Sequence, residues 1–188
     1  KTTTALDVVA NYQHMENAKG IVYADLENTL DRVWATKLGV DFTIAAGEPG
    51  CVYLLNPTNQ GAETIFQKLL EMIETGEIGL VVIDSLGVMV SNQAMDKTVE
   101  EKTYGGIGLA LTSFCKKAVS LCNKYDCTIV GINQMRADLS NPYGGETTTG
   151  GKGWKHNCVM RVEFRRGSSF DSKYKTISQR ASGNMGNF

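Results

Sequence analysis

Hydrophobic positions along the chain alternate between two spacings, one typical of amphipathic helices and one typical of buried strands. Helical spacing covers 4–17, 30–38, 60–75 and 109–125. Continuous apolar runs cover 20–25, 80–83 and 128–132, with shorter strand pieces expected over 42–57 and late strands over 159–164 and 174–177, a hairpin around Gly167. This alternation predicts one α/β domain over 1–188, a mainly parallel twisted sheet flanked by helices with a late β-hairpin.

Polar side chains follow three of the predicted strands at the point where each ends. Asp25 and Glu27 follow the first, Asp84 follows the second and Gln134 follows the third. Because ligands of parallel sheets bind at the carboxyl ends of the strands, these residues are the first candidates for a site.

Composition sets modest limits. The chain has 188 residues, 42% of them hydrophobic, and a net charge of −1. This is enough for a core, and any nucleic-acid binding must be local because there is no overall basic excess. No apolar run approaches the ~20 residues that span a bilayer. The chain has two histidines and five cysteines without a C-x-x-C pair, which predicts reduced thiols in a cytoplasmic protein and no zinc site.

The chain opens with Lys1-Thr2-Thr3, which looks like the last third of a phosphate-binding P-loop. In such a loop the lysine reaches the β- and γ-phosphates and the hydroxyl binds Mg²⁺. The glycine-rich turn that precedes the lysine in a complete P-loop is not in this sequence. We therefore interpret the chain as an amino-terminally truncated piece of a longer protein.

The segment Asn133-Gln134-Met135-Arg136 is followed ten residues later by Glu146-Thr147-Thr148-Thr149-Gly150-Gly151. A buried strand thus runs into an amide and a cation and then into a polar, glycine-rich loop. This pattern resembles the core of RecA-type recombinases, including phage-encoded relatives, in which these motifs bracket the second DNA-binding loop. The resemblance runs from Lys1 to about Arg166.

The resemblance implies a site for ATP and Mg²⁺, and assigns roles to matching residues. The phosphates would be bound by Lys1, Thr2 and Thr3, and the Mg²⁺ by Thr2 and, through water, Asp84. Glu27 would position the attacking water, and Gln134 would sense the γ-phosphate. Asp31 and Trp34 would flank the adenine. From the residues alone, other interpretations stay open: a solvent-facing Asp84, a Glu27 that caps the helix starting near Thr29, a competing Asp25, and a Trp34 in the core.

The resemblance also implies single-stranded DNA as a partner, gripped by two loops over 92–106 and 135–152. By position, the contacts would come from Lys116, Arg136, Tyr143, Gly150 and Gly151. A weaker site for duplex DNA could involve Arg165, Arg166, Lys173 and Lys175, although a solvated basic strand end is the simpler alternative.

Some positions depart from the family pattern. The first loop carries three carboxylates, Asp96, Glu100 and Glu101, and His156 stands where an aromatic subunit contact is expected. Only Arg180 remains where bacterial relatives have lysines that reach the neighbouring subunit's ATP. The missing lysines, the unusual late segment 179–184 and the shortened second loop favour a phage-like relative.

The sequence therefore predicts the core of an ATP-dependent recombinase in a bacterial cell or a phage-infected host, with no membrane partner. Its parent would form filaments on single-stranded DNA, promote strand exchange and act in recombination and repair. Two alternatives stay open: another ATPase of this fold, such as a hexameric helicase or a circadian-clock-type ATPase, and a non-hydrolysing DNA-binding fragment.

Overall fold

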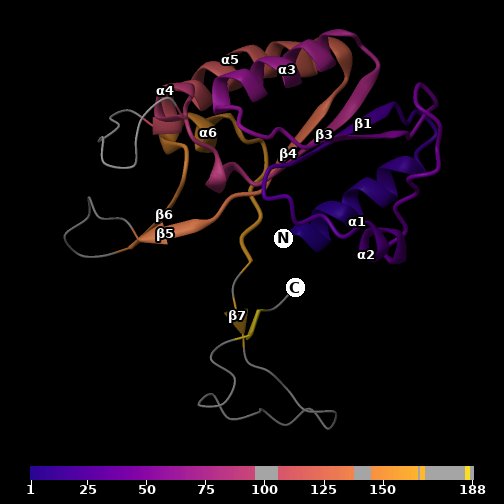
Figure 1. Cartoon of the computed structure of the whole chain (residues 1–188), viewed down its shortest axis with the longest axis horizontal. Coiled ribbons are helices and arrows are strands. Elements are labelled where there is room, and N and C mark those ends of the chain that lie inside the picture. Colours follow the sequence, from indigo (N-terminus) through magenta and orange to yellow (C-terminus); the bar gives the residue numbers. More distant parts are fainter. Residues whose placement is uncertain (96–105, 138–144, 165, 168–184, 187–188) are drawn as a thin grey trace, which may run out of the picture. The chain divides into compact units, whose positions relative to one another are not determined.

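The computed structural model describes residues 1–95, 106–137, 145–164, 166–167 and 185–186 (Figure 1). The chain divides into two compact units. One covers Thr2–Asn157, and the other consists of Lys1 with Cys158–Phe188. The first unit carries the sheet and its helices.

A four-stranded parallel sheet forms the centre of the first unit. Its strands lie in the order β2 (Val52–Leu55), β1 (Gly20–Asp25), β3 (Ile78–Asp84) and β4 (Thr128–Gly131). All three strand pairs are parallel. The two central strands, β1 and β3, are buried along their whole length, as their uninterrupted apolar runs predict.

Helices cover both faces of this sheet (Figure 1). Helices α1 (Thr2–Gln13) and α2 (Arg32–Lys37) lie on one face, and α3 (Ala62–Glu74) and α5 (Gly106–Tyr125) lie on the other. Each face buries its own hydrophobic cluster. In the cluster under α3 and α5, Phe66 and Phe114 stack with ring centroids 4.5 Å apart. The predicted α/β fold with a mainly parallel sheet is confirmed.

Short elements follow the carboxyl ends of β3 and β4. They are a 3₁₀ turn (Leu86–Val88), α4 (Asn92–Met95), the antiparallel pair β5 (Met135–Ala137) and β6 (Glu146–Thr148), and α6 (Gly151–Asn157). Helix α6 lies so close to β4 and α5 that glycine is needed at the contacts. A Cβ on Gly131 would come within 2.4 Å of the Trp154 ring, and one on Gly153 within 2.2 Å of Thr112 Oγ1.

Three details differ from the sequence prediction. Helix α1 spans Thr2–Gln13 rather than 4–17, α2 begins only at Arg32, and 42–57 contains the single strand β2. The start of α2 is set by Asp31, whose carboxylate accepts a hydrogen bond from Trp34 N–H at 3.0 Å. Such a cap fixes the first turn more directly than hydrophobic spacing does.

In the second unit, β7 (Arg166–Gly167) pairs antiparallel with β8 (Met185–Gly186). The predicted strand over 159–164 is wrong, because that described segment is irregular. Its apolar side chains Val159, Met160 and Val162 are exposed, Val159 fully at 106%. The predicted strand over 174–177 lies outside the described residues. In the part of the chain that is described, no helix is long and apolar enough to cross a membrane.

Candidate active site

The parallel register of β1 and β3 places Asp25 opposite Asp84 at the carboxyl end of the sheet. Asp84 is only 4% exposed. Its Oδ2 accepts hydrogen bonds from Thr2 Oγ1 at 2.8 Å and from the Tyr23 hydroxyl at 2.9 Å. The alternative in which Asp84 faces solvent is therefore wrong. The structure brings together Thr2 and Asp84, as the sequence predicts.

Tyr23 is a site residue that the sequence prediction missed. It lies in the middle of β1 and is almost completely buried. Burial, and then the neighbouring Asp84 carboxylate, raise the pKa of the Tyr23 hydroxyl well above its usual range, so this group stays protonated and donates. A tyrosine within an apolar strand is itself a signal, because a buried hydroxyl needs a partner.

Asp25 has a structural role. It is 3% exposed, and its two carboxylate oxygens accept hydrogen bonds from Thr29 N–H at 3.2 Å and Leu30 N–H at 2.9 Å. These bonds hold the turn after β1, in which Asn28 has a φ of +52°. Since both oxygens of Asp25 serve this turn, Glu27 is the better placed carboxylate for chemistry.

Glu27 points toward the ends of β3 and β4. Its Oε1 accepts hydrogen bonds from Ser85 Oγ at 2.5 Å and from Gln134 Nε2 at 3.4 Å. The helix-cap alternative for Glu27 is wrong, because Asp31 caps α2. Ser85, which is almost completely buried, is a second residue that the sequence prediction missed. A hydroxyl directly after a strand-end aspartate is the signal that could have found it.

Gln134 connects Glu27 to the polar motif behind β4. Its N–H donates to Asn133 Oδ1 at 2.8 Å, and Asn133 Nδ2 donates to the Thr149 carbonyl at 2.8 Å. Arg136 donates from Nε to Thr149 Oγ1 at 3.3 Å and from Nη2 to the Gly87 carbonyl at 3.1 Å. The two halves of the sequence motif, 133–136 and 146–151, are thus joined by hydrogen bonds at Thr149.

The residues assigned to the rest of the nucleotide lie in exposed positions. Trp34 is 47% exposed, so its alternative as a core residue is wrong. Asp31 and Trp34 share the first turn of α2, while Thr3 is exposed in the first turn of α1. Lys1 is exposed and belongs to the second unit.

The residues assigned to DNA divide into described and undescribed ones. Lys116 is exposed on α5, next to the buried Phe114 and Cys115. Gly150 and Gly151 both have left-handed backbones, with φ of +97° and +67°, and open α6. Tyr143, Arg165, Lys173, Lys175, Arg180 and most of the first loop (96–105) lie outside the described residues, and for Arg166 only the backbone is described.

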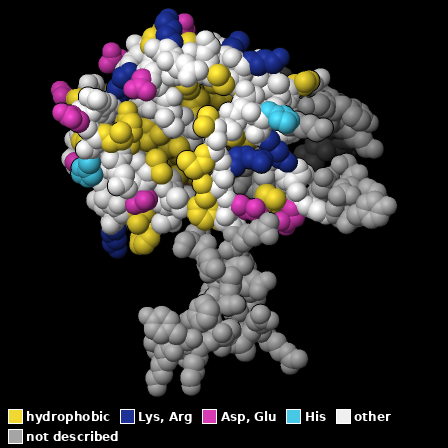
Figure 2. All heavy atoms as spheres, turned by 180° about the vertical axis from the view of Figure 1, so that it is seen from behind, with side chains coloured by type: hydrophobic (Ala, Val, Ile, Leu, Met, Phe, Trp, Pro, Cys, Tyr) yellow, Lys and Arg dark blue, Asp and Glu magenta, His cyan; other side chains and the backbone are white. Residues whose placement is uncertain are grey.

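Charge on the visible surface is local. Seen from behind, hydrophobic side chains gather in the middle of the described surface, and basic side chains lie in several separate places, one of them beside a histidine, rather than forming a continuous cover (Figure 2). This agrees with the net charge of −1. An electrostatic attraction to DNA would therefore have to come from local groups of cations rather than from the protein as a whole.

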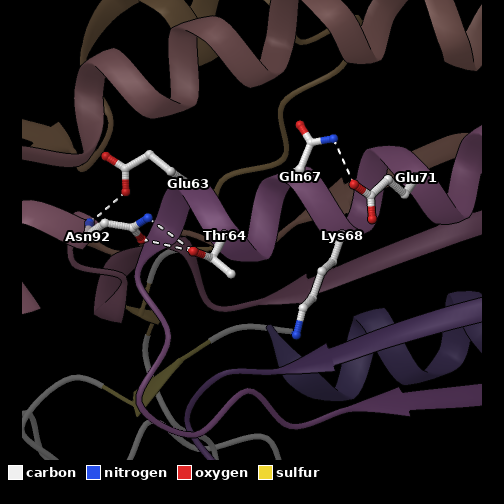
Figure 3. A pocket seen from close by; sticks show the side chains of 6 residues that line it. All are labelled: Glu63, Thr64, Gln67, Lys68, Glu71 and Asn92. Atoms are coloured by element: carbon white, nitrogen blue, oxygen red, sulfur yellow. Dashed lines mark hydrogen bonds between the residues drawn. The ribbon is translucent and has the colours of Figure 1, made fainter.

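A shallow pocket on the outer side of α3 is separate from these residues (Figure 3). Its side chains join α3 to the start of α4. Asn92 N–H donates to Glu63 Oε2 at 2.7 Å, and the Asn92 amide and the Thr64 hydroxyl are hydrogen-bonded at 3.0 Å. A Cβ on Gly61 would overlap Asn92. These contacts fix the start of the first predicted DNA loop, and none of the strand-end carboxylates Asp25, Glu27 and Asp84 lines this pocket.

The donor set at the sheet end fits a magnesium ion. Thr2 and Asp84 offer a hydroxyl and a carboxylate, the hard oxygen ligands that Mg²⁺ prefers. Among the described residues, no group of three or more His, Cys, Asp or Glu side chains could hold a metal alone. A magnesium ion here would therefore need oxygens from phosphate or water, as is usual for nucleotide-bound Mg²⁺.

Comparison with known proteins gives a consistent result. The family model described as the RecA N-terminal domain matches residues 1–184. Protein RecA of Mycoplasma pneumoniae is 28% identical over 175 residues, which cover 93% of this chain and 49% of that relative. Protein RecA of Ruminococcus albus is 29% identical over 182 residues, which cover 96% of this chain and 43% of that relative. The chain thus spans less than half the length of these two relatives.

Proposed function

The chain belongs to the RecA family, and on this premise we propose that it is the ATP-hydrolysing, single-stranded-DNA-binding core of a recombinase. Its parent protein would form a filament on DNA and promote strand exchange in homologous recombination and repair. ATP would be the substrate and Mg²⁺ the bound cofactor.

The contact between Glu27 and Gln134 is the observation that carries this proposal. It joins the neighbouring carboxyl ends of β1 and β3, where Asp25 and Asp84 lie, to the polar segment that follows β4. An amide cannot act as a base at neutral pH, but it can exchange one hydrogen-bond acceptor for another. If Gln134 left Glu27 for a phosphate oxygen, the segment bonded to Thr149 would move with it.

Residues around Asp84 would bind the nucleotide. Thr2 and Asp84 would hold Mg²⁺, Asp84 through water, and Lys1 and Thr3 would bind phosphate. When bound, the ion would neutralise charge on the phosphates. Tyr23 would keep the Asp84 carboxylate in one orientation, because its hydroxyl donates to Oδ2 from a buried position. Asp31 and the exposed Trp34 would flank the adenine.

Glu27 would position the attacking water. A carboxylate in this role must be fixed and ionised. The hydrogen bonds from Ser85 and Gln134 both end on Oε1 and would fix its direction.

DNA would bind at the segment behind Gln134. Arg136 is exposed and donates to a backbone carbonyl and a hydroxyl, both neutral acceptors. A phosphate is a stronger acceptor for a guanidinium, so Arg136 could exchange these partners for the DNA backbone. Gly150 and Gly151 would offer backbone N–H groups, with further contacts from Lys116 and Tyr143. Duplex DNA would bind more weakly near Arg165 and Arg166.

The test is a single-stranded DNA binding series across salt concentrations, with and without ATP and Mg²⁺, on three proteins: the unaltered chain, Gln134→Ala and Gln134→Glu. We expect ATP to raise the DNA affinity of the unaltered chain. Both variants should bind DNA and lose this dependence on ATP, because the amide that exchanges acceptors is missing.

The outcomes separate the candidate functions. Salt-sensitive DNA binding that ignores ATP in the unaltered chain would contradict the proposal and favour a non-hydrolysing DNA-binding fragment. Ring-shaped assemblies with ATP-driven translocation would favour a helicase. ATP-dependent DNA binding that survives in Gln134→Ala would support the recombinase core and remove Gln134 as the connection.

A further inference from the structure

The junction between α5 and β4 ends the helix in a way that brings two cysteines together. Asp126 has a left-handed backbone with a φ of +50°, and Cys127 N–H donates to the Cys122 carbonyl at 3.0 Å. This is the six-to-one hydrogen bond of a Schellman motif. In that motif the side chains of these two positions commonly touch. The fold therefore places two thiols side by side across the end of α5.

The two thiols differ in exposure. Cys127 is 8% exposed, while Cys122 is partly exposed. The neighbouring Cys127 thiol lowers the pKa of Cys122, whereas its neighbour Cys122 and then burial raise the pKa of Cys127. The partly exposed member of the pair is therefore the one that ionises and reacts first.

The surroundings hold this junction in place. Lys19 Nζ donates to the Tyr125 carbonyl at 2.7 Å, which satisfies one of the unpaired carbonyls at the end of α5. Lys19 also brings a positive charge near Cys127, while the neighbouring Asp126 brings a negative one. Since the backbone is fixed on both sides, the thiols remain neighbours without a conformational change.

We propose that Cys122 and Cys127 form a dithiol redox site, which a small-molecule disulfide such as oxidised glutathione converts to an intramolecular disulfide. The Cys122 thiolate attacks one glutathione sulfur and releases the other half as a glutathione thiolate. Cys127 then loses its proton and attacks Cys122 Sγ, which releases the second glutathione. Two protein thiols are oxidised, and one oxidised glutathione is reduced to two molecules of glutathione.

The other cysteines serve as internal references. Cys51 and Cys115 are buried. Cys158 is partly exposed like Cys122, but burial raises its pKa. Cys158 is therefore expected to form less thiolate than Cys122 and to react more slowly, although the two are similarly accessible.

Trypsin offers a direct test, because it cleaves after Lys117, Lys124 and Arg136. Cys122 and Cys127 therefore fall on separate peptides, 118–124 and 125–136. After treatment of the folded chain with oxidised glutathione, we expect these two peptides to be found joined, and separate again after dithiothreitol. Cys127→Ser should instead keep one glutathione on Cys122, and Cys158→Ser should behave like the unaltered chain.

Two outcomes would overturn the proposal. One is a stable glutathione adduct on Cys122 in the unaltered chain, which would mean that Cys127 cannot resolve it. The other is oxidation of Cys158 at the same rate as Cys122, which would mean that exposure alone governs reaction. Mapping of the unaltered chain decides both, even if a variant fails to fold.

Discussion

The carboxyl ends of β1 and β3 and the short ladder β5–β6 are joined through Gln134, yet they are built differently. Asp25 and Asp84 are buried, and their partners include Thr2 and Tyr23 from distant parts of the sequence. The ladder consists of two strands of three residues; Arg136 within it and Gln134 directly before it are both exposed.

This difference separates two tasks. Buried, hydrogen-bonded carboxylates keep one geometry, since breaking a buried hydrogen bond leaves an unsatisfied group that costs about 1–3 kcal/mol. Short, partly exposed strands open at much lower cost, and ligand-binding segments are commonly drawn from such regions. Gln134 lies at the boundary, and its 3.4 Å contact with Glu27 is long for a hydrogen bond. The hydrogen bond that connects the two regions is thus one that a ligand could break.

The largest effect is expected on catalysis, from a substitution at the carboxylates that follow β1 and β3. Glu27→Gln keeps the shape of the side chain but removes its charge, so it cannot polarise water. We expect ATP hydrolysis to fall by about 10²–10⁴-fold, the usual range for loss of a general base. Nucleotide binding should stay near normal. Steady-state hydrolysis and nucleotide titration of the same samples check both, and an equal loss of binding and hydrolysis would remove Glu27 from the catalytic role.

Substitution of two neighbouring glycines, Gly150 and Gly151, separates the effect of packing from that of backbone strain at the start of α6. Gly150→Ala places a Cβ 2.3 Å from Leu111 Cδ2 at a φ of +97°, whereas Gly151→Ala at +67° meets nothing within 4 Å. We expect Gly150→Ala to lower the free energy of unfolding by about 2–4 kcal/mol, from overpacking and strain together. Gly151→Ala should cost about 1 kcal/mol, from strain alone.

Urea unfolding of both variants measures this difference. Equal losses of unfolding free energy in the two variants would mean that Leu111 moves to make room for the added methyl group. The start of α6 would then change its packing as easily as the short strands β5 and β6. A larger loss of unfolding free energy for Gly150→Ala would mean that α6 is packed as rigidly as the buried ends of β1 and β3.

The buried strands were predictable from the sequence, and the late segment was not. Strands β1 and β3 consist of continuous apolar residues that end in carboxylates, and both central positions in the sheet follow from that pattern. The segment 159–164 also contains the β-forming residues Val159, Val162 and Phe164, but a strand also needs a partner. Propensity along one segment carries no information about which other segment lies beside it.

The types of residue in the site were predictable from the sequence, but their hydrogen-bond partners were not. Strand-end Asp84 and Gln134 are visible in the sequence, because polar residues after apolar runs are conspicuous. Tyr23 and Ser85 were missed because each lies in or beside an apolar run, where its hydroxyl is easily taken for a core feature. Their partners are 61 and 58 residues away in sequence. Only the register of the sheet brings such pairs together.

Tyr23→Phe tests how rigidly the buried region holds Asp84. The ring remains, but the hydroxyl donor to Asp84 is lost, so we expect a loss of about 1 kcal/mol in unfolding free energy. The Mg²⁺ concentration needed for half-maximal nucleotide binding should rise. Tyr12→Phe is the control, since it removes a hydroxyl that accepts from Lys19 N–H at 3.1 Å, a contact that does not involve Asp84. It should leave the Mg²⁺ requirement unchanged.

The same substitution changes the response to pH. The pKa of Tyr23 is raised in the folded state above its ordinary value of 10.0, so the folded protein holds this proton more tightly than the unfolded chain. The stability from Tyr23 is complete below that value and is lost as the pH rises above it. Tyr23→Phe should therefore reduce the loss of stability above pH 10, and an unchanged slope there would mean that Tyr23 is not the group responsible.

Arg136→Ala tests the short ladder β5–β6 and should give the smallest effect. The guanidinium donates to Gly87 and Thr149 in an exposed position, so its loss should cost little stability. If Arg136 exchanges these partners for a phosphate, the variant should bind single-stranded DNA more weakly, and the slope of log affinity against log salt should flatten by about one unit. Lys37→Ala, which removes an exposed cation from α2, should preserve the slope. A slope that Arg136→Ala leaves unchanged would confine this residue to its contacts with Gly87 and Thr149, and the exposed ladder would then adapt to DNA without it.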